Sequence, residues 1–131
     1  MKVFLHGIVN ASLIESNGMR TAEVIRQASS GEQIFTVREL TTEEVREVLA
    51  KGEGDLLWRV VKQMVPTFDL DLRHRLEIVV RATVSPTIDY VDAIFLCRDD
   101  RETLMLLSTE ILELTAQATG FESIAALHEV H

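Results

Sequence analysis

The spacing of hydrophobic residues predicts helices along most of the chain. In six segments, apolar side chains recur every three or four residues, as they do on one face of an α-helix. Gly31, Gly52 and Gly120 stand at the ends of three segments, and the Ser85–Pro86 pair opens another. The six segments are residues 17–32, 41–50, 56–65, 70–84, 86–95 and 101–120.

Strand-like alternation is concentrated near the N-terminus. Phe35 and Val37 alternate with polar residues and predict a short strand over residues 33–40. Val3–Ile14 fits one or two short strands or a leader, and residues 1–18 could be a leader or an upstream extension before Met19. Residues 68–72 also alternate, but the length of the apolar pattern favours a helix from about residue 70. We therefore expect a mainly α fold: a single small domain over residues 1–131 with five or six helices and a short β element near the N-terminus.

In the stretch FTVRELTTEEVREVLA, residues 35–50, the spacing of the apolar residues changes midway from that of a strand to that of a helix. Thr41 stands three residues before Glu44, which is the spacing of a capping box. In that motif the threonine hydroxyl accepts from the glutamate N–H, and the glutamate carboxylate accepts from the threonine N–H. The sequence therefore predicts a helix that begins sharply after Thr41.

Composition and charge narrow the possible partners. The chain has 131 residues, is 47% hydrophobic and carries 13 basic against 21 acidic residues, a formal charge of −8. Such a charge repels nucleic-acid phosphates, and no apolar run reaches the roughly 18 residues of a membrane-spanning helix. The single cysteine, Cys97, follows apolar residues and is expected to be a buried core residue in a reducing compartment. We expect a cytoplasmic protein that binds neither nucleic acid nor membrane.

Two clusters contain residues with catalytic or metal-binding chemistry. Asp69, Asp71 and His74 could do acid–base work at a cleft, although the aspartates also suit the start of a helix. His128 and His131 could share one helix face, but two ligands without a third support zinc only weakly. The sequence has no phosphate loop, dinucleotide fingerprint or nucleophile elbow. We therefore expect no catalytic residues, no cofactor and no metal.

The helix over residues 101–120 is apolar on two sides. Met105 and Leu112 lie about 130° around the helix from its main apolar stripe, at roughly 100° per residue. A helix with two apolar faces needs two partners. One is the core, and the second is another subunit, a client protein or a further part of the same core. We expect Met105 and Leu112 to mediate self-association in a homo-oligomer.

Three other residues are candidates for partner binding. Trp58 falls outside the narrow apolar stripe of its helix, so it forms a second helix contact or is partly exposed. Glu43 and Glu47 belong to the acidic face of the helix over residues 41–50. That face is either a solvated surface or a docking surface for a basic partner.

The order of these features resembles the tail assembly chaperones of long-tailed bacteriophages, which are small, acidic and mainly helical. The resemblance covers residues 33–121, and two stretches carry it: FTVRELTTEEVREVLA at 35–50 and LSTEILELTAQATGF at 107–121. It implies a non-enzymatic protein of the host cytoplasm that binds the tape-measure protein and keeps it soluble during tail morphogenesis. The alternatives are an acidic helical adaptor or regulatory binding protein, and a small hydrolase that uses Asp69, Asp71 and His74.

Overall fold

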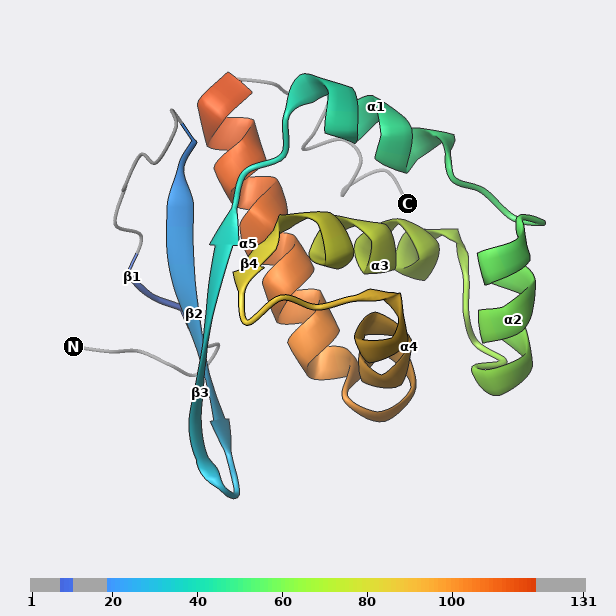
Figure 1. Ribbon diagram of the computed structural model, residues 1–131, viewed down its shortest axis with the longest axis horizontal. Helices are drawn as coiled ribbons and strands as arrows, with labels where there is room; N and C mark the ends of the chain where they lie inside the picture. The colour runs from blue at the N-terminus through green and yellow to red at the C-terminus, as the bar shows by residue number, and fades with distance from the viewer. Residues whose placement is uncertain (1–7, 11–18, 120–131) are drawn as a thin grey trace.

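The protein combines an antiparallel sheet with helices that lie on one side of it (Figure 1). The computed structural model describes residues 8–10 and 19–119. Its four strands run in the order β1-β2-β3-β4, and each neighbouring pair is antiparallel. The strands are β1 (Ile8–Asn10), β2 (Thr21–Ala28), β3 (Gly31–Arg38) and β4 (Thr83–Ser85). The helices are α1 (Thr42–Ala50), α2 (Leu56–Met64), α3 (Leu70–Ala82), α4 (Tyr90–Asp99) and α5 (Arg101–Thr119).

The expected mainly α class is wrong, because the fold is mixed α/β. The described part of the chain contains five helices, but the strands form one sheet and are not confined to the N-terminus. β4 lies between α3 and α4 in the sequence and pairs with β3. Of the suggested leader over residues 1–18, only residues 8–10 are described, and they form β1. The rest of that segment lies outside the described residues.

The segment over residues 17–32 was expected to be a helix, but it contains β2 and the turn into β3. Ala22 and Val24 are buried and stand opposite Val37 and Phe35 of β3. The apolar positions of this segment fit both helical and strand periods, so whether it forms a helix or a strand depends on the segment that packs against it. Pairing with β3 satisfies the backbone of both strands and buries both apolar faces together. Gly31 therefore closes a hairpin at a φ of 121° and does not end a helix.

The start of α4 is also later than expected. Pro86 does not open the helix but follows β4 in a turn, after a cis peptide bond from Ser85. A residue before proline is biased away from the helical region, which suits the end of a strand. The helix begins at Tyr90, where Asp89 and Asp92 form a capping box.

The helices at residues 42–50, 56–64, 70–82 and 101–119 are confirmed as α1, α2, α3 and α5. The capping box of α1 is also confirmed: Glu44 N–H donates to the Thr41 hydroxyl at 3.1 Å, and Thr41 N–H donates to the Glu44 carboxylate at 3.0 Å. The spacing of threonine and glutamate was enough to predict this helix start, because both residues of the capping box lie within four residues of each other.

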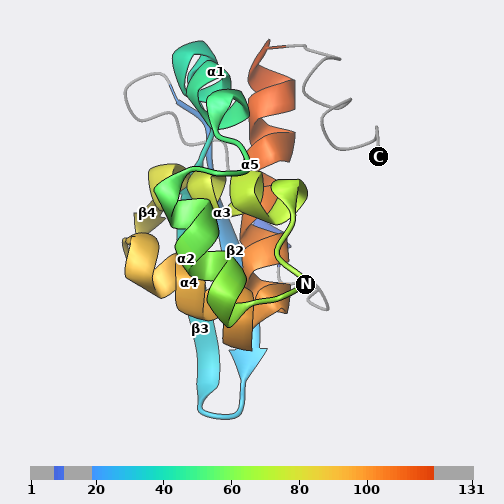
Figure 2. The same ribbon diagram turned by 90° about the vertical axis from the view of Figure 1, so that its right-hand side faces the viewer.

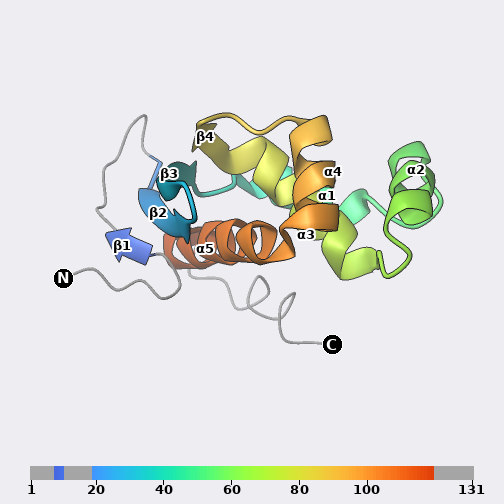
Figure 3. The same ribbon diagram turned by 90° about the horizontal axis from the view of Figure 1, so that it is seen from below.

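The core lies between the sheet and the helices. The long helix α5 packs against β2 and β3 and also contacts α3 and α4. Leu104, Leu107 and Ile111 of its main stripe are fully buried. Cys97 is confirmed as a buried core residue, and burial raises the pKa of its thiol. In Figures 1 and 3, α2 lies at the end of the molecule that is farthest from the sheet.

Candidate interaction site on helix α2

Helix α2 has an apolar stripe that faces solvent. Leu56, Val60 and Met64 recur every four residues, so they lie on one side of the helix. Their exposed fractions are 72%, 45% and 37%. Three large exposed hydrophobic residues on one side of a helix form an apolar patch, and a contiguous exposed apolar patch can mark a binding surface. Figure 2 shows that α2 is not covered by another helix when viewed from its outer side.

The opposite side of α2 is anchored to the body of the protein. Val61 is fully buried, and the ring of Trp58 lies 5.1 Å from the ring of the buried Phe68. Lys62 donates to the Phe68 carbonyl oxygen at 2.9 Å and lies over the Trp58 ring. Trp58 thus forms an internal contact and is partly buried. The helix is therefore held in place while its apolar stripe stays exposed.

Asp55 connects α2 to α3. One carboxylate oxygen accepts from Trp58 N–H at 2.7 Å and caps α2, and the other accepts from Arg73 at 2.9 Å. Partial burial would raise the pKa of Asp55, but the hydrogen bonds from Arg73 and Trp58 hold it below its ordinary value. A capping residue that also pairs with another helix sets the position of α2 relative to α3.

A groove of about 410 Å³ lies beside the exposed stripe. It is lined by Leu56, Leu57 and Val60 of α2, by Arg73 of α3 and by Tyr90 of α4. The lining is mainly apolar, with two polar side chains from neighbouring helices. Such a groove can receive apolar side chains from a partner and orient them with a few polar contacts.

A buried carboxylate supports the polar wall of this groove. Glu77 is fully buried and accepts hydrogen bonds from Tyr90 at 2.6 Å, Arg73 at 2.9 Å and Arg81 at 3.0 Å. Burial alone would raise the pKa of Glu77, but these three hydrogen bonds and the charge of Arg73 lower it below its ordinary value. Glu77 therefore stays ionised and holds Arg73 and Tyr90 in fixed positions.

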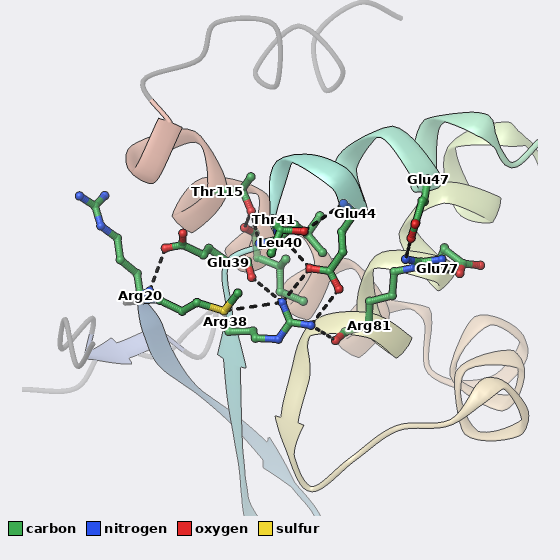
Figure 4. Close-up of polar contacts among 12 residues, drawn as sticks. Arg20, Arg38, Glu39, Leu40, Thr41, Glu44, Glu47, Glu77, Arg81 and Thr115 are labelled. Carbon is green, nitrogen blue, oxygen red and sulfur yellow. Dashed lines mark hydrogen bonds and ion pairs between the residues drawn. The ribbon is translucent and has the colours of Figure 1, made fainter. Parts of the chain in front are cut away.

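The same network extends to α1, as Figure 4 shows. Arg38 of β3 binds the Glu44 carboxylate through two hydrogen bonds at 2.9 and 3.0 Å, and it also donates to the Arg81 carbonyl oxygen at 2.7 Å. Arg81 in turn forms an ion pair with Glu47. Glu47 is thus a structural partner of α3, whereas Glu43 is exposed in the first turn of α1.

The two candidate residues on α5 differ in burial. Leu112 is 4% exposed and belongs to the core, and Met105 is partly buried against that core. Leu112 therefore packs inside a single chain, whereas Met105 keeps part of its surface exposed. The Leu112 side chain is too little exposed to form a contact with another subunit.

The residues expected for a hydrolase each have a structural contact. Asp69 caps α3 by accepting a backbone N–H of its first turn at 2.9 Å, and Asp71 pairs with Arg75 at 2.9 Å. The Nε2 atom of His74 lies 2.9 Å from the Lys51 carbonyl oxygen. The described contacts thus tie each of the three side chains to a different partner.

The described residues contain neither a candidate metal cluster nor a helix able to span a membrane. Within residues 8–10 and 19–119, no group of three histidine, cysteine, aspartate or glutamate side chains could hold a metal ion. His128 and His131 lie outside the described residues. None of the described helices has the length and hydropathy needed to cross a membrane.

No protein-family model, curated protein or solved structure significantly matches this chain.

The sequence located α2 but did not indicate which of its faces is exposed. Val61 is buried, whereas Leu56, Val60 and Met64 are exposed. Apolar residues occupy most positions of α2, so spacing alone cannot decide which side faces the core. The roles of Glu77 and Tyr90 were also missed, because they are thirteen residues apart and meet only in the folded chain.

Proposed function

We propose that this protein is a non-enzymatic tail assembly chaperone that holds an amphipathic helix of a tape-measure protein on helix α2. The binding surface is the exposed stripe of Leu56, Val60 and Met64 together with the adjacent groove. The exposed stripe on an anchored helix is the observation that carries this proposal.

The physical basis is the packing of one helix against another. An amphipathic helix binds through apolar side chains at positions i, i+3, i+4 and i+7, which interlock with a complementary surface. The stripe on α2 offers such a surface, and the groove lined by Leu57 and Tyr90 can receive a larger side chain. Burial of apolar area on both partners supplies the affinity.

The acidic charge fits the same role. The chain carries a formal charge of −8, and a net charge of this size keeps a complex with an apolar client in solution. One ion pair joins Glu47 of α1 to Arg81 of α3, and another joins Asp55, which caps α2, to Arg73 of α3, so these helices are held to one another. A rigid scaffold loses little conformational entropy when the client binds.

Co-expression with the tape-measure protein of the same phage tests this function. We expect the soluble fraction of the tape-measure protein to rise when the wild-type chain is present. Leu56→Asp and Val60→Asp should abolish that effect, since each removes apolar burial worth roughly 1.5–3 kcal/mol and hence about ten- to hundredfold in affinity. Leu49→Asp is the matched control, because Leu49 is an exposed apolar residue that lies on α1 and does not belong to the stripe or line the groove.

A direct binding measurement can follow the fluorescence anisotropy of a labelled helical peptide from the client. Trp58 is a poor reporter, because it packs against Phe68 on the side of α2 opposite the stripe. An acidic adaptor with another client would leave the tape-measure protein insoluble and its peptides unbound. Equal activity of the wild type and the two stripe variants would refute the proposed surface.

A further inference from the structure

The outer edge of β3 is only partly paired. β4 is short, and its register with β3 covers Thr36 opposite Ser85 and Val37 opposite Thr83. Towards the hairpin turn, β3 continues beyond the end of β4. Ile34 lies in this extension, and its side chain is 50% exposed. In Figure 1 the hairpin of β2 and β3 projects past the end of β4.

The direction of the peptide groups follows from the register of the hairpin. Glu39 N–H donates to the Arg20 carbonyl oxygen at 3.0 Å, so the peptide groups of Glu39 face the β2 side. Successive residues of a strand point their peptide groups in opposite directions, and β2 and β3 keep one register along their whole length. The N–H and C=O groups of Phe35 therefore face β2, and those of Ile34 face the β4 side. Among the described strands, none pairs with Ile34 on that side.

A second groove adjoins this open edge. It has a volume of about 450 Å³ and lies between Phe35 of β3, the turn after β4 and one side of α4. Its apolar lining includes Ile88, which is buried, and Phe95, which is 44% exposed. An open strand edge with an apolar groove beside it is the arrangement that accepts an added strand from a partner: the edge supplies backbone hydrogen bonds and the groove receives alternate side chains.

The acidic lining of this groove favours a partner with basic side chains. Asp92, Asp99 and Asp100 belong to its lining, which contains no basic residue. Arg98 pairs with Asp99 and Arg26 pairs with Asp100, whereas Asp92 has no ion pair within the described part of the chain. An extended segment with basic side chains complements this surface, and a segment with acidic side chains is repelled.

We propose that the open edge of β3 at Ile34, with the groove between β3 and α4, binds an extended protein segment in which apolar and basic residues alternate. The segment pairs with the N–H and C=O groups of Ile34 as an added antiparallel or parallel strand. Its apolar side chains enter the groove beside Phe35 and Phe95, and its basic side chains face Asp92. This site is separate from the α2 stripe and does not depend on it.

A second copy of the chain fits this edge less well. Each copy carries a formal charge of −8, and pairing of two β3 edges would bring the aspartates of both grooves together. We therefore assign the edge to a basic segment of another protein.

Fluorescence anisotropy with a labelled short peptide that alternates lysine with valine tests this inference on the full chain. We expect binding that weakens with salt and is lost when glutamate replaces each lysine. Ile34→Pro should weaken binding about tenfold, because it removes an outward N–H at a position where an edge strand tolerates proline. Ile34→Val is the matched control that keeps the N–H. Asp92→Asn should weaken binding severalfold, because it removes the charge but keeps an oxygen that can accept the Asp89 N–H.

A second control changes the peptide and leaves the protein, and hence its fold, unchanged. Methylation of every backbone amide of the peptide removes strand pairing on both edges but keeps charge and side chains, and we expect it to abolish binding. Equal binding of the methylated peptide, or equal binding by Ile34→Pro, would overturn the proposal. So would no binding at peptide concentrations up to about 1 mM, or a wild-type dimer in light scattering that Ile34→Pro dissociates. Leu56→Asp should leave this peptide's affinity unchanged, which separates this site from the one on α2.

Discussion

The Tyr90 hydroxyl donates a hydrogen bond to the fully buried carboxylate of Glu77 at 2.6 Å. This bond joins the first turn of α4 to the middle of α3, beside the groove on α2. Glu77 also binds Arg73 and Arg81, so one carboxylate fixes three side chains from two helices. The position of the groove wall therefore depends on the charge state of Glu77 and on the proton of Tyr90.

The pKa of Tyr90 provides a test of its hydrogen bond to Glu77. Burial and then the hydrogen bond to Glu77 raise the pKa of Tyr90 to about 12 from its ordinary 10.0. Tyr90 is the single tyrosine, so the absorbance change of tyrosinate reports its titration directly. We expect a midpoint near 12 in the folded protein, and a lower midpoint in Glu77→Gln, because an amide does not oppose the tyrosinate charge.

The raised pKa of Tyr90 also makes the free energy of unfolding depend on pH. Because the folded pKa exceeds the unfolded pKa, the unfolded chain loses its proton first as pH rises. The contribution of Tyr90 is therefore complete below pH 10 and is lost as pH rises through about 12. Tyr90→Phe should not show this loss. A titration midpoint near 10 in the folded wild type would contradict the buried hydrogen bond.

Glu77→Gln should destabilise the protein strongly at neutral pH. The change leaves Arg73 and Arg81 without their shared buried carboxylate, and breaking a buried pair costs about 3–5 kcal/mol. Urea denaturation followed by circular dichroism measures this free energy of unfolding. Asp71→Asn is the matched control: its partner is Arg75 and its side chain is 42% exposed, so we expect a loss of at most about 1 kcal/mol.

The pH dependence of these variants follows from the lowered pKa of Glu77. A carboxylate with a lowered folded pKa stabilises the protein above its unfolded pKa, and this contribution disappears as pH falls through the folded pKa. The wild type should therefore lose more stability than Glu77→Gln as the pH drops from neutral into the acid range below 4.5, the ordinary value for glutamate. Parallel acid profiles of the two proteins would argue against an ionised Glu77.

The two apolar sides of α5 can be separated by substitution. Leu112 is buried within one chain, so Leu112→Glu should lower the free energy of unfolding by more than about 2 kcal/mol and reduce helicity. Met105 is only partly buried, and Met105→Glu should cost less. Light scattering gives the mass in the same samples. If the mass of the wild type fell by half in Leu112→Glu while helicity stayed constant, Leu112 would belong to a subunit interface.

The local sequence determined where most helices begin. Thr41 and Glu44 form their capping box within one turn, and Asp55 and Asp69 cap α2 and α3 in the same local way. Such contacts join residues within three or four positions of each other, so spacing in the sequence is enough to recognise them. Gly52 and Pro66, which follow α1 and α2, are further local signals of this kind.

Only the tertiary structure decided the class of the fold and the nature of the site. β2 has apolar positions that fit a helix, and it becomes a strand because β3 offers matching backbone groups and an apolar face. β4 is three residues long and exists only because β3 lies beside it. The exposed stripe of α2 depends on which side Phe68 and Arg73 occupy, and Glu77 meets Tyr90 only after α3 and α4 pack together. These relationships join residues that are far apart in the sequence or ambiguous in their own pattern, so the free energy of packing, and not the local pattern, selects among the alternatives.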